Sequence, residues 1–348
     1  MTKYIIKRLL LALLVLLGVS LILYILLRCM PVNYIIDKFS TQMSQGNMKA
    51  EDLRRIMASY GFDLVLEVQE VAGQERIVDY WVDNSFANIM GGYFKWLGNL
   101  FKGDLGTSFK YNMPVGQKIA ETMGISFGIS FVSLIFEVII AIPLGIKCAC
   151  NQYGKFDYIT TFIFMTLMAF PSFFLGNMVI KWFAVDLGWF PSGGLSNLTN
   201  VDFFTLLGDN LYHLVLPMFV ITLLNIGSLL RYTRTNTLEV LNADYIRTAR
   251  AKGLSERKVV YKHVFRNTMV PIVTMTAGII PSLFGGMMIL EQVFALDGIG
   301  SYAYAALADG DIPFVMGYNM FIAILTVIGT LLSDITYMLV DPRIKISK

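Results

Sequence analysis

Six long apolar runs alternate with polar segments along the chain. Each run approaches the roughly 20 residues that an α-helix needs to cross the hydrocarbon core of a bilayer. The fourth run is the weakest, because it is shorter and contains Pro217 and Asn225. The pattern therefore predicts an all-α polytopic membrane protein with about six transmembrane helices. The predicted spans are residues 9–27, 122–146, 158–185, 214–230, 269–290 and 314–340.

The first apolar run follows Lys3, Lys7 and Arg8, an arrangement that signal peptides also have. However, the run is long enough to span a membrane, and the Arg-Cys-Met-Pro sequence after it lacks a small-residue cleavage site. We therefore interpret the run as an anchor, so that residues 1–28 form an N-terminal tail and transmembrane helix 1.

Residues 29–117 separate the first two spans and are predicted to form a small extracytoplasmic α+β domain. Apolar residues at helical spacing predict helices over 49–57 and 86–101, and alternating apolar and polar residues predict a hairpin over 65–82. A stripe on the second helix fits a helix lying in the membrane interface and a helix packed on the domain's own core equally well. The stripe consists of Phe86, Ile89, Tyr93, Trp96, Leu97 and Leu100.

Composition and charge place this chain in a bilayer and orient it. Of its 348 residues, 55% are hydrophobic and 15% are charged, and the mean hydropathy is +0.61, which is too apolar for an ordinary soluble fold. The loops 186–213 and 291–313 contain no Lys or Arg. Three, two, nine and three basic residues lie in the segments 1–8, 147–157, 231–268 and 341–348, respectively. The positive-inside rule therefore predicts that the N- and C-termini are both cytoplasmic.

Motifs for chemistry are missing from the sequence. It has no Gly-x-x-x-x-Gly-Lys-Ser/Thr phosphate loop, no His-Glu-x-x-His and no Gly-x-Ser-x-Gly, so we expect no catalytic residues and no cofactor in this chain. Cys148 and Cys150 have the wrong spacing for zinc, and no metal site is expected. Glu137 is the only carboxylate deep within a span, and it fits a substrate or proton contact and a carboxylate bonded inside the bundle equally well.

The basic segment 231–268 has the pattern of a helix, a tight turn and a second helix. Gly253 follows Lys252 as a helix stop, and Ser255 is a good N-cap for the next helix. We expect the small Ala249 and the turn at Gly253 to let another protein's surface approach closely. An ordinary basic loop remains the alternative on the pattern alone. The first helix is indicated by Leu238, Leu241, Tyr245, Ile246 and Ala249.

The run Asn-Ala-Asp-Tyr-Ile-Arg-Thr-Ala-Arg-Ala-Lys-Gly-Leu at 242–254 resembles the coupling loop of ABC importer permeases. Its closest resemblance is to the B-type permease subunits of oligopeptide and dipeptide transporters. In the general pattern of Glu-Ala-Ala, three residues and Gly, Ala249 and Gly253 fit, whereas Arg247 and Thr248 replace the first Glu and Ala. The resemblance implies an ATPase-coupling loop made by Ala243, Asp244, Tyr245, Arg247, Thr248, Ala249, Lys252, Gly253 and Leu254.

Four other segments resemble the same family in the same order: residues 103–109, 190–194, 298–300 and 341–343. The resemblance implies a five-helix permease core over 118–340, which includes the coupling loop 231–268, and a cytoplasmic tail over 341–348. It covers the chain apart from residues 62–85, where the hairpin looks like an insertion.

The resemblance implies a permease in a bacterial or archaeal cell membrane that forms the translocation pathway for oligopeptides or dipeptides. Its implied partners are a second homologous permease subunit, two cytoplasmic ATPase subunits that bind ATP and Mg, an extracytoplasmic peptide-binding protein, the peptide and membrane lipid, with no nucleic acid. A nickel or other small-solute ABC permease is the nearest alternative. An ion-coupled carrier and a non-transporting receptor or scaffold also remain open.

Overall fold

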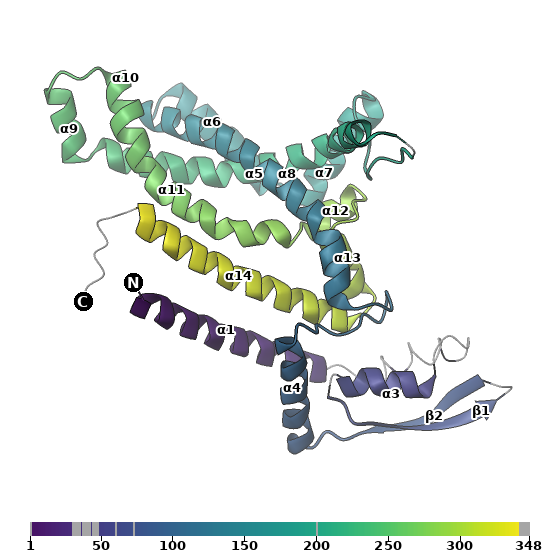
Figure 1. The fold of residues 1–348 in the computed structure, drawn as a ribbon. Helices are drawn as coiled ribbons and strands as arrows, with labels where there is room; N and C mark the ends of the chain where they lie inside the picture. The colour runs from purple at the N-terminus through teal and green to yellow at the C-terminus, as the bar shows by residue number, and fades with distance from the viewer. Residues whose placement is uncertain are drawn as a thin grey trace. The chain divides into compact units, whose positions relative to one another are not determined.

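A computed structural model describes residues 2–29, 36, 43, 49–59, 61–71, 74–199 and 201–340 of the protein (Figure 1). The chain divides into two compact units that do not follow chain order. Unit 1 contains Thr122–Tyr304 and the residues from Leu325 onward, and unit 2 contains Thr2–Glu121 and Ala305–Ile324. The domain boundaries expected from the sequence remain a prediction.

Within the described residues, four helices are long and apolar enough to cross a membrane, and two bent helix pairs bring the number of candidate spans to six. Helix α8 is continuous although it contains Pro217, and Asp202 caps its start by accepting hydrogen bonds from the amides of Phe204 and Thr205. The mostly helical, multi-pass fold class is therefore confirmed. The four long helices are α1 (Thr2–Arg28), α5 (Val115–Cys150), α8 (Phe203–Leu241) and α14 (Ile312–Val340).

The span predicted over 158–185 is not one straight helix. It consists of α6 (Lys155–Ala169) and a second part that starts with α7 (Ser172–Val179), and the two parts meet at 103°. Pro171 causes the break, because it lacks an amide hydrogen and disfavours helical geometry in the residue before it. Phe170 accordingly has an extended backbone, with φ −72° and ψ 136°. The second part continues as the π-helical η1 (Ile180–Asp186).

The span predicted over 269–290 is also bent. Helix α11 (Phe265–Ile279) passes into the 3₁₀ turn η3 (Ile280–Phe284), which contains Pro281. The short helix α12 (Met288–Val293) follows, and the pair bends by 46°. The chain then enters α13 (Ile299–Ala308). Two of the six predicted spans are thus interrupted at prolines, where the backbone loses a helical hydrogen bond.

Unit 2 contains the hairpin and both helices that the pattern between the first two spans predicts. Strands β1 (Leu64–Val71) and β2 (Gln74–Val82) pair antiparallel, with a register shift between Glu67 and Val68. Helices α3 (Ala50–Ser59) and α4 (Phe86–Phe101) pack with them on one apolar cluster. The buried members of this cluster include Tyr24, Leu53, Phe62, Leu66, Tyr93 and Trp96.

The turn 103–109 of unit 2 is held by a buried carboxylate. Asp311, at the start of α14, is fully buried and accepts hydrogen bonds from the Ser108 hydroxyl and from the amides of Phe109 and Lys110. The segment 103–109 is therefore bound to the beginning of the last long helix.

In unit 1, a backbone hydrogen bond holds the segment 190–194. The amide of Gly194 donates to the carbonyl of Phe294. The segment 341–343 lies outside the described residues.

Candidate functional site

The segment 231–268 forms the expected helix, turn and helix in unit 1 (Figure 1). Helix α8 ends at Leu241, and the short helix α9 (Asp244–Ala251) begins after a break at Asn242 and Ala243. Gly253 then reverses the chain with a φ of +76°, a backbone geometry that favours glycine. Ser255 occupies the N-cap position of α10 (Glu256–Lys258), which continues through the π-helical η2 (Val259–Val264) into α11.

Helix α9 is held against η2 by a small apolar core. Ile246, Val259 and Val264 are fully buried, and Ala249 is only 8% exposed. Ile246 and Ala249 are three residues apart and therefore lie on one face of α9. The half-buried Val240, Leu241 and Leu254 complete this cluster. The hairpin of α9 and η2 is thus a packed element and not an unsupported loop.

Because of this packing, some residues of the expected coupling loop are buried or half-buried and others are exposed. Ala249, which was expected at a surface that another protein approaches, is buried. Ala249 faces the core of the hairpin because the neighbouring Ile246 must bury its larger side chain on the same side. Ala243 and Leu254 are half-buried. The exposed members of the set are Asp244, Tyr245, Arg247, Thr248, Lys252 and Gly253.

An ion pair closes the turn between α9 and α10. The Arg250 guanidinium donates to both carboxylate oxygens of Glu256, at 3.1 Å from Nε and 2.5 Å from Nη2. This contact raises the pKa of Arg250 above its ordinary value. Both side chains are substantially exposed, so the pair contributes about 0.2–1 kcal/mol and mainly fixes the geometry of the turn.

A second ion pair ties the base of the hairpin to α6. The Arg234 guanidinium, near the end of α8, binds both oxygens of Asp157 at 2.7 Å. Asp157 is buried, and its Oδ2 also accepts a hydrogen bond from the Tyr153 amide at 3.0 Å. The bidentate geometry satisfies both charges where they leave water. The segments 147–157 and 231–268, which the charge pattern assigns to one side of the membrane, therefore meet in the structure.

Close backbone packing supports the same region. A Cβ atom at Gly145 in α5 would lie 2.8 Å from both the Leu230 carbonyl oxygen and the Thr233 Cβ, so α5 and α8 approach here as only a glycine permits. Glu137, eight residues before Gly145 in α5, is also buried. The α9–η2 hairpin is thus attached to the region where α5, α6 and α8 pack closely together. We expect a displacement of α9 to move these helices as well.

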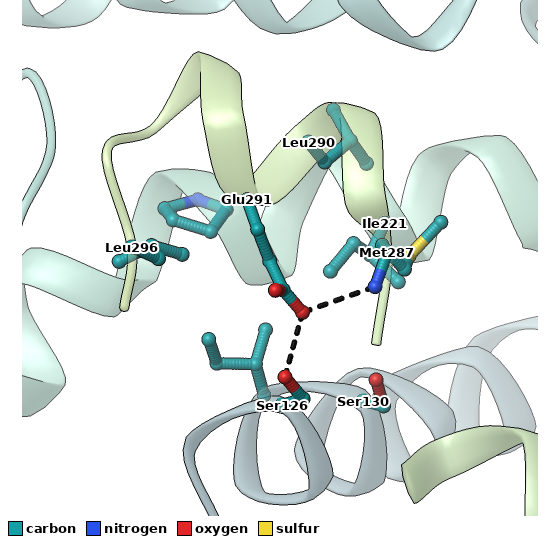
Figure 2. Close-up of a pocket in the computed structure, with 9 residues that line it drawn as sticks. Ser126, Ser130, Ile221, Met287, Leu290, Glu291 and Leu296 are labelled. Atoms are coloured by element: carbon teal, nitrogen blue, oxygen red, sulfur yellow. Dashed lines mark hydrogen bonds between the residues drawn. The ribbon is translucent and has the colours of Figure 1, made fainter. Parts of the chain in front are cut away.

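A buried carboxylate organises a second cluster of unit 1 (Figure 2). Glu291 in α12 accepts a hydrogen bond from the Ser126 hydroxyl of α5 at 2.7 Å and one from the Met287 amide at 3.0 Å, both drawn in Figure 2. Its other oxygen accepts a hydrogen bond from the Ser301 amide at 2.8 Å. Ser126 in turn accepts a hydrogen bond from the Ile299 amide at 2.9 Å. One side chain thereby binds the start of α13 to α5.

Glycines make this cluster possible. A Cβ atom at Gly286, Gly298 or Gly300 would lie within contact distance of the Glu291 carboxylate, so each position has room for hydrogen only. Gly286 also has a φ of +70°. The Gly-Ile-Gly turn at 298–300 is therefore a cradle for Glu291. An adjoining cavity of about 10 Å³ approaches the size that one water molecule needs.

Sequence reasoning missed the partners that join distant segments. Glu291 lies in the loop 291–313 and Arg234 in the basic segment 231–268, which served only to orient the chain, and Asp157 carried no prediction. The spacing of two glycines around Ile299 was the one available signal for the cradle. No periodic pattern marks a pair such as Asp157 and Arg234, which are 77 residues apart.

Comparison with known proteins agrees with this arrangement. Residues 141–346 match the family described as "Binding-protein-dependent transport system inner membrane component". The matched segment contains the α9–η2 hairpin and Glu291 with its glycine cradle, whereas Ser126 lies before it. It covers more than half of the chain.

Two curated relatives are similar to the protein over nearly their whole length. The oligopeptide transport system permease protein AppB of Bacillus subtilis (strain 168) is 35% identical over 346 residues, which are 99% of this chain and 100% of the relative. The dipeptide transport system permease protein DppB of Alkalihalophilus pseudofirmus is 29% identical over 360 residues, covering 99% of this chain and 100% of the relative. A chain of the inward-facing MetNI methionine ABC transporter aligns with a TM-score of 0.48 at 17% identity, covering 64% of this chain and 96% of its own.

Proposed function

The chain belongs to the family of binding-protein-dependent transport system inner membrane components, and we propose that it is the permease subunit of an ABC importer for oligopeptides or dipeptides. The single observation that carries this proposal is the similarity to AppB over 99% of this chain and the whole of that protein. Both relatives named above are peptide permeases. A nickel or other small-solute substrate is therefore not favoured.

The proposed division of labour places ATP chemistry outside this chain. The family is described as an inner membrane component of transport systems, and we expect this chain to be a non-catalytic subunit. We infer that a second, homologous permease subunit completes the pathway and that two cytoplasmic ATPase subunits bind ATP and Mg. An extracytoplasmic peptide-binding protein would deliver the substrate to the opposite side.

The α9–η2 hairpin is the proposed contact for an ATPase subunit. Tyr245, Thr248 and Lys252 lie at positions i, i+3 and i+7 of the segment and are all exposed, so they form one outward face. Asp244 and Arg247 border this face. We propose that these exposed residues contact the ATPase subunit in place of Ala249. Ala249 packs in the core of the hairpin and stabilises the helix that presents them.

Coupling requires two arrangements of the same elements, each favoured by a different nucleotide state of the ATPases. The hairpin is suited to transmit such a change, because its core and the Asp157–Arg234 pair connect it to α6 and α8. Under the proposed topology, the hairpin and both termini face the cytoplasm. Movement of the ATPases would then change the tilt of the spans and expose the pathway alternately to each side.

Uptake of labelled peptides of graded length by vesicles that contain the complete complex tests the proposed substrate. We expect ATP-dependent accumulation of peptides that also requires the binding protein. Nickel uptake is measured in the same vesicles. Nickel accumulation without peptide accumulation would overturn the substrate assignment, and peptide uptake that needs neither ATP nor ATPase subunits would overturn the transporter class.

A further inference from the structure

Helix α4 has three faces, where an ordinary surface helix has two. At about 100° per residue, its sixteen positions separate into three arcs around the helix axis. The first arc is buried in the core of unit 2 and contains Tyr93 and Trp96, which are 7% and 4% exposed. The core of unit 2 therefore explains this arc alone, and the other two arcs need a separate explanation.

The second arc is apolar, although none of the described residues covers it. Phe86, Phe94 and Phe101 are 79%, 62% and 71% exposed and lie within about 80° of one another around the helix. The third arc is polar, and it contains the exposed Lys95 and Lys102 together with Asn88 and Asn99. Its centre is about 150° away from the centre of the phenylalanine arc. Leaving three large aromatic side chains in water at these positions would be costly.

Contacts with α1 fix where α4 lies along a membrane span. The Ser20 hydroxyl and the Tyr93 hydroxyl share a buried hydrogen bond of 2.9 Å. The ring centroids of Tyr24 lie 5.5 Å from Tyr93 and 5.9 Å from Trp96. Figure 1 shows α4 running across α1 and not alongside it. The helix therefore crosses the span at the level of Ser20 to Tyr24.

This level lies inside the apolar part of the span. Arg28 is the first charged residue after the apolar run, and Tyr24 and Ser20 precede it by about 6 Å and 12 Å at 1.5 Å per residue. The neighbouring side chains of α1 are open to lipid, since Ile22, Ile25 and Leu26 are 50–59% exposed. Helices in the membrane interface are buried about 5–10 Å below the headgroup boundary. The level of α4, about 6–12 Å below Arg28, overlaps that range.

We propose that α4 lies in the membrane interface, with Phe86, Phe94 and Phe101 inserted among the acyl chains and Lys95 and Lys102 directed to the lipid phosphates. A phospholipid monolayer fits this surface because α4 crosses α1 at the level where the apolar side chains Ile22, Ile25 and Leu26 of α1 are also exposed. The two lysines complement the negative phosphates on the opposite arc. The inference depends only on α1 being a span, and it is independent of the substrate proposed above.

Spin labels at single cysteines test this assignment in the full-length chain. The three native cysteines, Cys29, Cys148 and Cys150, are replaced by serine, and the chain is reconstituted in vesicles of phosphatidylethanolamine and phosphatidylglycerol. A label is placed at Phe94→Cys and, as the matched control on the next residue, at Lys95→Cys. Leu14→Cys, on the exposed side of α1, supplies the lipid reference. Collision rates with oxygen, which partitions into lipid, and with a water-soluble nickel chelate are measured at each label.

We expect the ratio of oxygen to chelate collisions at Phe94→Cys to exceed that at Lys95→Cys severalfold and to fall between the values for Lys95→Cys and Leu14→Cys. Equal ratios at the two neighbouring positions would place α4 in water and overturn the proposal. A Phe94→Cys label that collides with neither reagent would also overturn it, because the arc would then be covered by protein, such as a second copy of the chain.

Two further labels protect the test against a local folding defect. Phe86→Cys and Phe101→Cys place labels on the same exposed arc. Each is made in a separate variant that keeps Phe94, so neither result depends on the substitution at Phe94. We expect lipid-type ratios at both. If Phe86→Cys and Phe101→Cys show water-type ratios while Leu14→Cys remains in lipid, the helix does not lie in the interface.

Discussion

Adjacent residues of α9 provide the sharpest test of the coupling hairpin, because one lies in the core of the hairpin and the next is exposed. Ala249 is buried against η2, whereas Thr248 is exposed. Introducing the same charge at each position, as Ala249→Glu and Thr248→Glu, separates the stability of the hairpin from its contact with a partner. The two variants are otherwise matched in charge and in sequence position.

The expected cost of Ala249→Glu follows from two possible responses of the hairpin. If α9 stays in place, the new carboxylate loses its hydration, which costs several kcal/mol. If α9 moves away, Ile246 and Val259 become exposed, and each fully buried aliphatic side chain contributes about 1.5–3 kcal/mol. The hairpin adopts the response that costs less free energy, so we expect its local stability to fall by about 3 kcal/mol.

Thr248→Glu should leave the hairpin folded. The Thr248 hydroxyl donates to the Asp244 carbonyl one turn earlier, at 2.9 Å, and the side chain is exposed, so its loss and the added charge together cost about 0.5 kcal/mol or less. On the proposed function, however, the charge lies beside the outward face of Tyr245 and Lys252. We therefore expect Thr248→Glu to reduce the ATPase activity that the binding protein stimulates in the assembled complex.

Hydrogen exchange of the amides in 244–264 measures the first effect, and ATPase stimulation in reconstituted vesicles measures the second. A loss of about 3 kcal/mol should raise the exchange rate of Ala249→Glu about a hundredfold, with Thr248→Glu close to the unsubstituted chain. Unchanged exchange in Ala249→Glu would refute the buried placement of α9. Full ATPase stimulation in Thr248→Glu would remove the exposed face as the coupling contact.

Two further substitutions test the contacts that join distant segments. Glu291→Gln should lower the free energy of unfolding of the detergent-purified chain by about 1.5–3 kcal/mol, because the NH₂ group of Gln then faces another hydrogen-bond donor, a backbone amide or a hydroxyl. An unchanged unfolding midpoint would show that the carboxylate is not needed. Removing either partner of the buried pair, by Asp157→Ala or Arg234→Ala, should cost about 3 kcal/mol, and the double variant should cost less than the sum by more than about 0.5 kcal/mol. Strict additivity in this double-mutant cycle would mean that the two side chains do not interact.

Local elements of this protein were predictable because their signals lie within short stretches of chain. The apolar runs gave the candidate spans, and the spacing of apolar residues gave α4 with the bounds 86–101. The alternation over 65–82 gave the β-hairpin, and Gly253 gave the turn after α9. In each case the periodicity of one helix or strand, or the backbone freedom of one glycine, is sufficient.

The direction of individual side chains was less predictable, even within correctly predicted helices. The apolar stripe of α4 included Phe86, which is exposed, together with Tyr93 and Trp96, which are buried. Ala249 was expected at a contact surface and instead packs inward. A helical pattern shows which residues share a face, but the partners of that face come from other parts of the chain.

The sequence by itself determined a multi-pass helical protein with a basic helical hairpin, because hydrophobicity and helix periodicity are properties of neighbouring residues. Only the tertiary structure decided that Glu291 binds Ser126 and the start of α13, that Asp157 pairs with Arg234, and that the predicted third span turns by 103°. These features depend on atoms from segments far apart in the chain. Their free energies arise from burial and hydrogen bonding that exist only after the helices have packed.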